Sequence, residues 1–435
     1  MLELTSFRKR RLHIGRPRRP AVAGIVMALS FALLLAALTL PTWLPSAIRR
    51  AIPDRYIDAY APAPLRAFVF QRNTSTDVLP TAASVAGTSN QALAQGLLGE
   101  TRSDVAGSEN SNNAPVSTQP AAQNISIPNS YTLQGFNHTY QAWNNCGPAT
   151  LTTTLSYWGV DITQNNVAGF VKPNPEDRNV RPDELAAYTV SIGKNAVVRV
   201  NGNLQLLKQL IAAGFPPIVE QGFEVEKLGW MGHYTVLTGY SDDKESFTSQ
   251  DSYLGPNRQY AYAEIEKYWP HFNRTYIIVY DSKQANEVEA IVSADMDDQA
   301  MWKHSLDSAR AQLGVNANDP FGWFNLGSSL LALGNNTDAA VAFDQARALG
   351  LPWRMLWYQF GPFEAYLAVD RYADVRNLAD STLADNIYSE EAYYYKGRAY
   401  LGEGKTLEAR AQFETAVQYN KNYQAALNAI ASMSK

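Results

Sequence analysis

The sequence predicts an α+β domain over residues 131–283 and an all-α repeat domain over residues 284–435, preceded by one transmembrane helix and a flexible linker. Three observations predict this layout. A helical pattern around the only cysteine is followed mostly by strand patterns, a helical repeat fills the C-terminal part, and twenty residues near the N-terminus carry no charge. A chain of 435 residues, 46% of them hydrophobic, is long enough for two folded domains and unstructured sequence besides.

Composition argues against several classes of function. The net charge is −4 and the basic residues cluster only near the N-terminus, so nucleic acid is not an expected partner. One cysteine forms no intrachain disulfide and no cysteine-based zinc site. The five histidines lack the spacing of metal ligands, and they are His13, His138, His233, His271 and His304. We therefore expect no metal and no organic cofactor.

The N-terminal part predicts a membrane anchor at residues 21–43. Residues 21–40 are uncharged and long enough to cross a bilayer as a helix. Seven basic residues precede this run and three follow it soon after, which predicts a cytoplasmic tail over residues 1–20 and an extracytoplasmic remainder. A cleaved signal peptide is the alternative, but the run is longer than a usual signal core and lacks a clear cleavage site.

Residues 44–130 predict a linker. From about Gln71 to Asn129 the composition shifts to Ser, Thr, Asn, Ala and Gln with almost no aromatic residues. Such a segment buries too little apolar surface to fold, and it is typical of a flexible tether.

The stretch from Gln141 to Gly159, QAWNNCGPATLTTTLSYWG, predicts a helix whose first turn holds Cys146. Leu151, Leu155 and Trp158 recur at helical spacing after a Gly-Pro pair, and proline is tolerated in a first turn. The unpaired N–H groups and the positive end of the dipole at a helix N-terminus stabilise a thiolate. Cys146 is therefore a candidate nucleophile.

Downstream of this helix the pattern turns mostly to strands. We expect helices that start around Asp183 and at Leu204, and strands at residues 195–200, 216–223, 233–240, 245–252 and 275–281. The residues SDDK predict the turn of a hairpin between the third and fourth of these strands. One helix followed mostly by strands is an α+β layout.

A cysteine nucleophile needs a base close in space and a third group that orients this base. His233 begins a predicted core strand after Gly229 and Gly232, which leave room for a substrate backbone beside the imidazole. The histidine is therefore the candidate base.

The register of the predicted hairpin indicates which acidic residue orients the base. For a turn centred near Asp242, residues whose numbers sum to about 484 face each other, so Asp251 lies opposite His233. Directly opposed side chains share a face, with Cβ atoms about 5 Å apart. A slip of one residue turns Asp251 to the other face. Asp242 and Asp243 are alternatives, but they lie at the far end of the strand.

The C-terminal part contains an internal repeat. The pattern W-x2-L-G-x2-Y followed by A-x3-F is matched by Trp323, Leu326, Gly327, Leu330, Ala339, Phe343 and Ala346. A degenerate copy contains Trp357, Phe360, Gly361 and Ala373, and a third copy contains Tyr393, Gly397, Tyr400, Ala409, Phe413 and Ala416. This spacing resembles a tetratricopeptide (TPR) solenoid of about three repeats, whose groove is a possible site for a protein partner.

The run GEGKT, Gly402 to Thr406, looks like the end of a phosphate-binding loop. However, the position of the first glycine holds Ala399, and no strand precedes it. We interpret the run as a turn between two repeat helices, so a nucleotide is not an expected partner.

Taken together, the motifs of residues 131–282 resemble the papain-like cysteine peptidases of family thirty-nine. The resemblance is carried by Gln141 ahead of NNCGPAT, by GHYTVLTGYSDD and by QDSYLG. Well-known members cleave double-glycine leaders from bacteriocin precursors, often as part of an exporter. The likeness is closer to the stand-alone branch, because no transporter or ATP-binding motif follows, and the double-glycine substrate is not carried over.

The resemblance implies a papain-like fold and four site residues. Cys146 matches the nucleophile, His233 the general base and Asp251 the orienting acid. Gln141 matches the glutamine of the oxyanion hole, although it lies five residues before the cysteine rather than the usual six. Asn144 and Asn145 therefore remain alternatives. The implied reaction is cleavage of a peptide bond through a thioester, without a cofactor.

We thus expect a membrane-anchored, extracytoplasmic cysteine peptidase that acts on a peptide or protein substrate. Two alternatives remain. One is an inactive peptidase fold that serves as a binding scaffold together with the repeats. The other is a cell-wall amidase of the NlpC/P60 type, whose nucleophile typically stands in a D-C-S motif, whereas Asn-Cys-Gly-Pro stands here.

Overall fold

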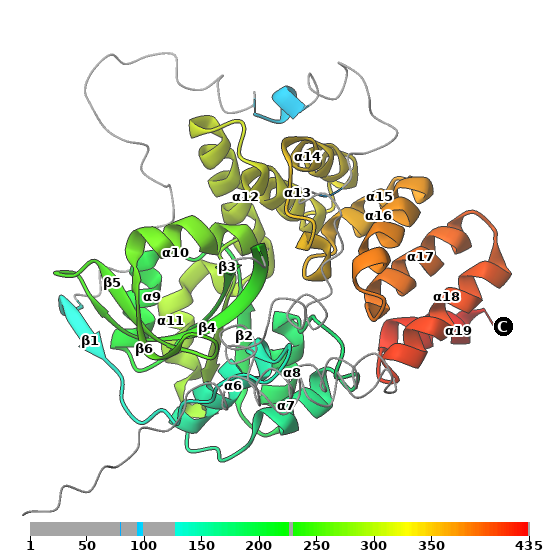
Figure 1. Cartoon of the computed structure of the whole chain (residues 1–435). Helices are drawn as coiled ribbons and strands as arrows, with labels where there is room; N and C mark the ends of the chain where they lie inside the picture. Colours follow the sequence, from blue (N-terminus) through cyan, green and yellow to red (C-terminus); the bar gives the residue numbers. More distant parts are fainter. Residues whose placement is uncertain (1–78, 80–93, 99–126, 226–228, 434–435) are drawn as a thin grey trace, which may run out of the picture. The chain divides into compact units, whose positions relative to one another are not determined.

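The structure is a computed structural model that describes residues 79, 94–98, 127–225 and 229–433 (Figure 1). The predicted cytoplasmic tail 1–20 and transmembrane segment 21–43 lie outside the described residues. Among the residues that are described, no helix combines the length and apolar composition that crossing a membrane requires.

The α+β region is built on an antiparallel sheet in the order β2-β7-β3-β4-β5-β6, with β1 paired to β4. Its strands are β1 (Ser130–Thr132), β2 (Asn195–Arg199), β3 (Ile218–Val225), β4 (Gly229–Ser241), β5 (Ser246–Asp251), β6 (Gly255–Ala261) and β7 (Tyr276–Tyr280). The predicted α+β layout is therefore confirmed. β6 was not predicted, because its exposed polar residues give no strong strand pattern.

Helices cover both faces of the sheet. They are α6 (Cys146–Tyr157), α7 (Gln164–Val171), α8 (Pro182–Ser191), α9 (Leu204–Ala212), α10 (Tyr262–Tyr268), η1 (Trp269–Phe272), η2 (Ser282–Gln284) and α11 (Ala285–Val292). Successive strand residues point to opposite faces. Ile218 and Val236 accordingly pack with α6, α7 and α8, whereas Val219 and Leu237 pack with α9 and α11.

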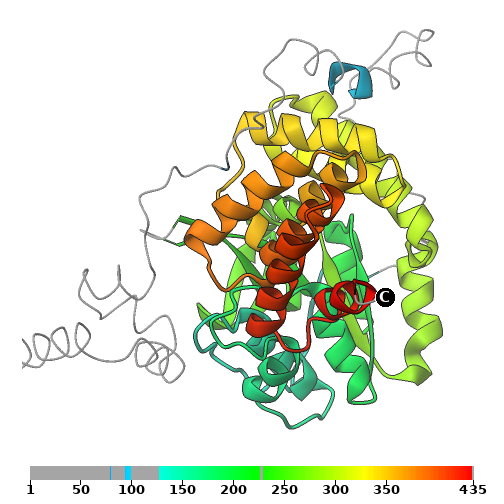
Figure 2. The same ribbon diagram turned by 90° about the vertical axis from the view of Figure 1, so that its right-hand side faces the viewer.

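A mostly helical region follows, as the sequence predicts (Figure 2). It comprises η3 (Ser293–Met296), α12 (Asp298–Val315), α13 (Pro320–Ala332), α14 (Asn336–Leu349), η4 (Met355–Trp357), α15 (Gly361–Ala368), α16 (Tyr372–Asp385), α17 (Glu390–Gly402), α18 (Thr406–Tyr419) and α19 (Gln424–Ser432). The GEGKT run forms the predicted turn between α17 and α18, with Gly404 at φ 75°. The resemblance to tetratricopeptide repeats stays a prediction.

The helical region shares a hydrophobic core with the α+β region. Trp230 of β4 and Phe272 of η1 belong to the same buried cluster as Phe324 and Phe343. Two described pieces of the 44–130 segment join this cluster, namely Leu79 and the helical residues 94–98. The Leu79 N–H donates to the carbonyl of Leu351 over 2.9 Å.

Candidate active site

Helix α6 begins at Cys146, as the sequence predicts. Leu151 and Leu155 are fully buried and anchor the helix on the sheet. The threonines suit this packed setting, since the Thr150 hydroxyl donates to the Tyr234 carbonyl over 3.0 Å and ties α6 to β4. This contact holds the start of α6, and with it Cys146, beside His233, the residue before Tyr234 in β4.

The observed register of the β4–β5 hairpin differs from the predicted one. Val236 pairs with Gln250, so that continuing the ladder by one residue places Asp251 across from Thr235 rather than from His233. The two site residues are diagonal neighbours, two positions apart, and still share a face because the side-chain period of a strand is two.

A β-bulge between Leu237 and Gly239 determines that shared face. Beyond the bulge, Gly239 pairs with Thr248, a register one residue different from that of Val236 and Gln250. Without the extra residue, the register of Gly239 and Thr248 would continue along the whole hairpin. Asp251 would then lie on the opposite face of the sheet from His233. No sequence signal marks this bulge apart from the Thr238-Gly239 pair.

His233 and Asp251 form a buried pair. The imidazole Nε2 donates to Asp251 Oδ2 over 2.9 Å, and the two side chains are 3% and 0% exposed. Asp251 Oδ2 also accepts from the Tyr260 hydroxyl at 2.6 Å, while Oδ1 accepts from the backbone N–H groups of Tyr253 and Leu254 at 2.8 and 2.7 Å. With Nε2 engaged, the ring nitrogen that remains for Cys146 is Nδ1.

These contacts set the charges of the pair. Burial by itself lowers the pKa of His233, but the Asp251 carboxylate and a hydrogen bond with Cys146 raise this pKa to about 10. Burial by itself raises the pKa of Asp251, but the His233 charge and the accepted hydrogen bonds lower it to about 2. The pair is therefore an imidazolium and a carboxylate at neutral pH.

Phe223 of β3 restricts the imidazole further. Its ring stacks on His233 with centroids 4.6 Å apart and 26° between the planes. No sequence pattern singles out Phe223, Tyr260 or Ser252. An aromatic or hydroxyl residue on a strand is too common to single out before the pairing of strands is known.

Gln141 lies in the site despite its unusual spacing from the cysteine. It is 7% exposed and lines the same pocket as Cys146 and His233. The Ser252 hydroxyl donates to its Oε1 over 2.9 Å, and its backbone N–H donates to the Ser252 carbonyl over 2.9 Å. These two bonds fix the side-chain amide beside the end of β5.

Asn144 and Asn145, the two alternatives to Gln141, occupy different places in the structure. Asn144 lines the pocket, with its backbone in the left-handed region at φ 55° and its carbonyl accepting from the buried Lys172 Nζ over 2.7 Å. Asn145 precedes α6 and its amide donates to Gln164 Oε1 over 3.0 Å. Asn144 therefore remains near the reacting groups, whereas Asn145 supports the loop.

Gly232 lines the pocket together with Cys146 and His233, and the expectation that Gly229 and Gly232 leave room for a substrate backbone stays a prediction. A Cβ atom added at Gly232 would lie 2.7 Å from the Phe272 ring and 3.2 Å from the Tyr358 ring. The space that a side chain at position 232 would take is therefore filled by other parts of the chain. Glycine at 232 lets the helical region approach β4 closely, next to His233.

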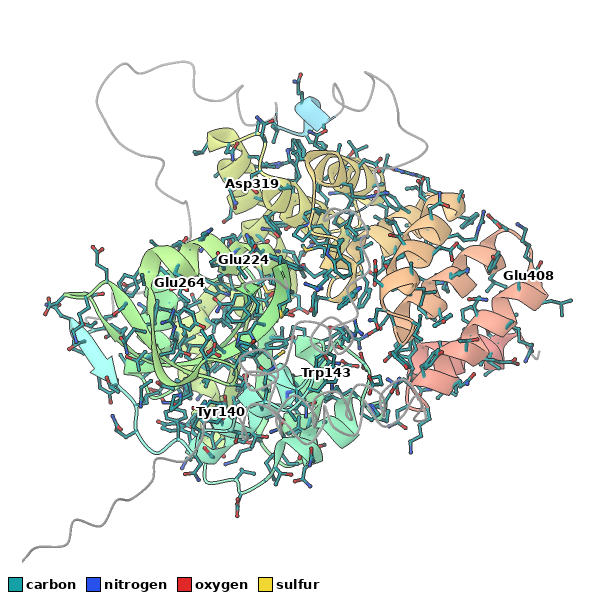
Figure 3. All side chains as sticks on the ribbon, in the orientation of Figure 1. Tyr140, Trp143, Glu224, Glu264, Asp319 and Glu408 are labelled. Carbon is teal, nitrogen blue, oxygen red and sulfur yellow. The ribbon has the colours of Figure 1, made fainter. Side chains whose placement is uncertain are left out.

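The pocket around Cys146 draws on both regions of the chain. From the α+β region it is lined by residues that include Trp143 (labelled in Figure 3), Arg178, Phe223, Met231 and Tyr253. From the helical region it is lined by Arg354, Trp357 and Tyr358. Among the residues that the structure describes, no cluster of His, Cys, Asp or Glu is arranged to hold a metal ion.

Part of the chain is similar to known peptidases. Residues 120–277 match the family model described as Peptidase C39 like family. A solved structure of a C39-like peptidase from Bacillus anthracis is 16% identical, with a TM-score of 0.29 over 35% of this chain and 98% of its own. A double glycine motif protease from an AMS/PCAT transporter, solved with the leader peptide, is 16% identical, with a TM-score of 0.27 over 34% of this chain and 92% of its own.

A search of curated proteins gives no match to the chain. The family match covers the segment that contains Cys146, His233 and Asp251, and it ends before the helical region begins. Residues 120–277 are therefore similar to the C39-like peptidases, which supports a peptidase function in general for this part of the chain.

Proposed function

We propose that the chain is a cysteine peptidase that cleaves peptide bonds through Cys146, His233 and Asp251. The observation that carries this proposal is the buried His233–Asp251 pair beside a cysteine that begins a helix. A nucleophile, a base within reach of it and a carboxylate that orients this base are the parts that such catalysis requires. The family match to C39-like peptidases agrees with this reaction.

In the first step, the Cys146 thiolate attacks the carbonyl carbon of the scissile peptide bond. The oxyanion that forms accepts hydrogen bonds from the Cys146 backbone N–H, which has no partner within α6, and from the Gln141 amide. The His233 imidazolium then donates its proton to the leaving amine. The C–N bond breaks, and the acyl part of the substrate stays on Cys146 as a thioester.

In the second step, neutral His233 takes a proton from a water molecule, which attacks the thioester carbonyl. The C–S bond breaks, the carboxylic acid product leaves, and the thiolate and imidazolium are restored. Asp251 holds the imidazole through Nε2 in both steps, so that Nδ1 faces the reacting atoms.

The reactivity of Cys146 tests this proposal. Because the imidazolium stabilises a thiolate, Cys146 is expected to react with iodoacetamide at pH 6 at least about tenfold faster than free cysteine, which is almost entirely a thiol at that pH. Cys146 is the only cysteine, so intact mass spectrometry reports this site alone. A rate equal to that of free cysteine, together with no cleavage of proteome-derived peptides, would favour a binding scaffold instead.

We also propose that residues 21–43 anchor the protein in a membrane, with both folded regions on the extracytoplasmic side. The proposal rests on the uncharged run and on the excess of basic residues before it. In the same proposal the C-terminal helices are tetratricopeptide-like repeats that contact a protein.

A reporter fusion checks the topology. Alkaline phosphatase fused after Lys435 is expected to be active, because this enzyme matures only outside the cytoplasm, whereas a cytoplasmic reporter such as β-galactosidase is expected to be inactive there. Inactive alkaline phosphatase together with active β-galactosidase would contradict the proposed membrane topology. Replacing the seven basic residues before the span by glutamine is expected to lower the ratio of alkaline phosphatase activity to β-galactosidase activity, because these charges favour a cytoplasmic N-terminus.

A further inference from the structure

The helical region departs from its repeat pattern at the point where it meets the catalytic pocket. The first helices of the outer pairs, α13 and α17, have 13 residues each, whereas α15 has 8. Residues 351–360, which precede α15, form turns and the short helix η4 instead. The degenerate second copy in the sequence therefore begins within a segment of different structure, which we name the insert segment (residues 351–360).

The insert segment is attached to the strand that carries His233. Arg354 Nη1 donates to the Trp230 carbonyl over 2.9 Å, and Gln359 Nε2 donates to the His271 carbonyl over 3.0 Å. The Tyr358 ring fills the space beside Gly232, as described above. These contacts fix the insert segment against the peptidase-like region rather than leaving it as a free loop.

Trp357 is the part of this segment with an unused hydrogen-bonding group. The residue lines the pocket together with Cys146 and is 5% exposed. Its indole Nε1–H is buried, and no protein group among the described residues accepts from it. A buried donor that has no acceptor is costly, so that it needs an explanation in a native structure.

The surroundings of Trp357 hold its ring in one place. Arg178 lies over the ring at 4.9 Å from its centroid, Arg354 lies at 5.5 Å, and Trp353 packs edge-on at 5.1 Å. The pocket contains a second buried donor without an acceptor among the described residues, Nδ2 of Asn144. One donor comes from each region of the chain, and both belong to residues that line the pocket with Cys146.

We infer that Trp357 is a substrate-binding residue whose indole N–H donates a hydrogen bond to a backbone carbonyl of the peptide, so that the substrate binds between the peptidase-like and helical regions. The inference rests on the proposed peptidase function. A backbone carbonyl is the fitting partner, because every peptide carries one near its scissile bond and the indole N–H only donates. The helical region is then part of the catalytic pocket.

The variant Trp357→Phe tests the inference, because it removes the donor and keeps an aromatic ring. The substrate is a synthetic octapeptide taken from the best-cleaved sequence in a tryptic digest of a bacterial proteome. The variant is expected to lower kcat/KM roughly 3- to 10-fold, the range for one neutral hydrogen bond, mainly through a higher KM. Alkylation of Cys146 by iodoacetamide is expected to be unchanged.

The matched control is Trp302→Phe, the same substitution at a half-buried residue of α12, outside the pocket lining. It is expected to leave kcat/KM within about twofold. Thermal unfolding of both variants shows whether they keep the fold.

A second measurement tests the hydrogen bond without depending on the stability of the variant. Octapeptides in which one backbone carbonyl oxygen at a time is replaced by sulfur, a weaker acceptor, are cleaved by the wild-type protein and by Trp357→Phe. At one position the sulfur is expected to slow the wild type but not the variant, as in a double-mutant cycle. Equal effects at all positions, or equal kinetics for the two tryptophan variants, overturn the inference and leave the peptidase function standing. The absence of any cleavage by the wild type counts against the peptidase function itself.

Discussion

The variant Cys146→Ala is expected to lower kcat for peptide hydrolysis by about 10⁴- to 10⁶-fold while the protein stays folded. In the proposed mechanism Cys146 forms the covalent intermediate, and no other cysteine in the chain replaces it. Residues that act as a unit are not additive. The double variant with His233→Ala is therefore expected to be no slower than Cys146→Ala alone, as measured by peptide cleavage followed by mass spectrometry.

The control for this experiment lies on the same helix. Ser156 is near the far end of α6, and its hydroxyl donates to the Thr153 carbonyl over 2.7 Å. Ser156→Ala is expected to keep kcat within about twofold, because surface changes away from the site have small effects. Activity of Cys146→Ala within tenfold of the wild type would contradict the assigned nucleophile.

The variant Asp251→Asn is expected to lower kcat by about 10⁴-fold, as loss of the orienting carboxylate does in a serine peptidase. An asparagine that keeps the backbone bonds of Tyr253 and Leu254 on its oxygen presents an NH₂ group to Nε2 of His233. This NH₂ group donates, so the neutral imidazole turns to the tautomer with its proton on Nδ1. Nδ1 then no longer accepts a proton during catalysis.

The same substitution is expected to lower stability and to change its pH dependence. Removing one partner of a buried ion pair costs about 3–5 kcal/mol of unfolding free energy. The pKa of His233 is raised from 6.5 to about 10, so its contribution is complete below pH 6.5 and is lost as the pH rises to 10. The pKa of Asp251 is lowered from 3.8 to about 2, so its contribution is complete above pH 3.8 and is lost as the pH falls to 2.

Urea unfolding between pH 3 and pH 10 checks this expectation. The wild-type pair contributes most between about pH 4 and 6.5, and Asp251→Asn is expected to remove the decline above pH 6.5 that His233 causes. Asp242→Asn is the matched control, because Asp242 lies at the other end of the same hairpin and bonds to Lys208 and Tyr262. It is expected to leave kcat unchanged and to cost about 1 kcal/mol, because this ion pair is only partly buried and stays in contact with solvent. A larger effect on kcat from Asp242→Asn than from Asp251→Asn would contradict the proposal that Asp251 is the orienting acid.

Local sequence signals were sufficient for the framework of the site. The helix at Cys146, the strand at His233 and the hairpin that brings Asp251 near it follow from apolar spacing and turn residues within a few positions along the chain. The predicted register was displaced by two residues. The conclusion that Asp251 and His233 share a face survived, because a displacement of two preserves the face.

The remaining parts of the site depend on contacts between residues far apart in the chain. Tyr260, Ser252 and Phe223 are ordinary strand or loop residues until the sheet pairs them with Asp251, Gln141 and His233. A bulge and a cross-strand contact depend on the packing of the whole sheet, for which a single sequence has no local pattern.

The sequence by itself determined the α+β order of elements and the helical C-terminal region and indicated a candidate nucleophile and base, because each rests on a short-range period or on a unique residue. Only the tertiary structure decided that the insert segment lines the pocket that contains Cys146. Trp357 is 211 positions from Cys146 along the chain, and no spacing rule spans such a separation. Gly232 permits the close approach that joins the two regions, since any side chain there would collide with Phe272 and Tyr358.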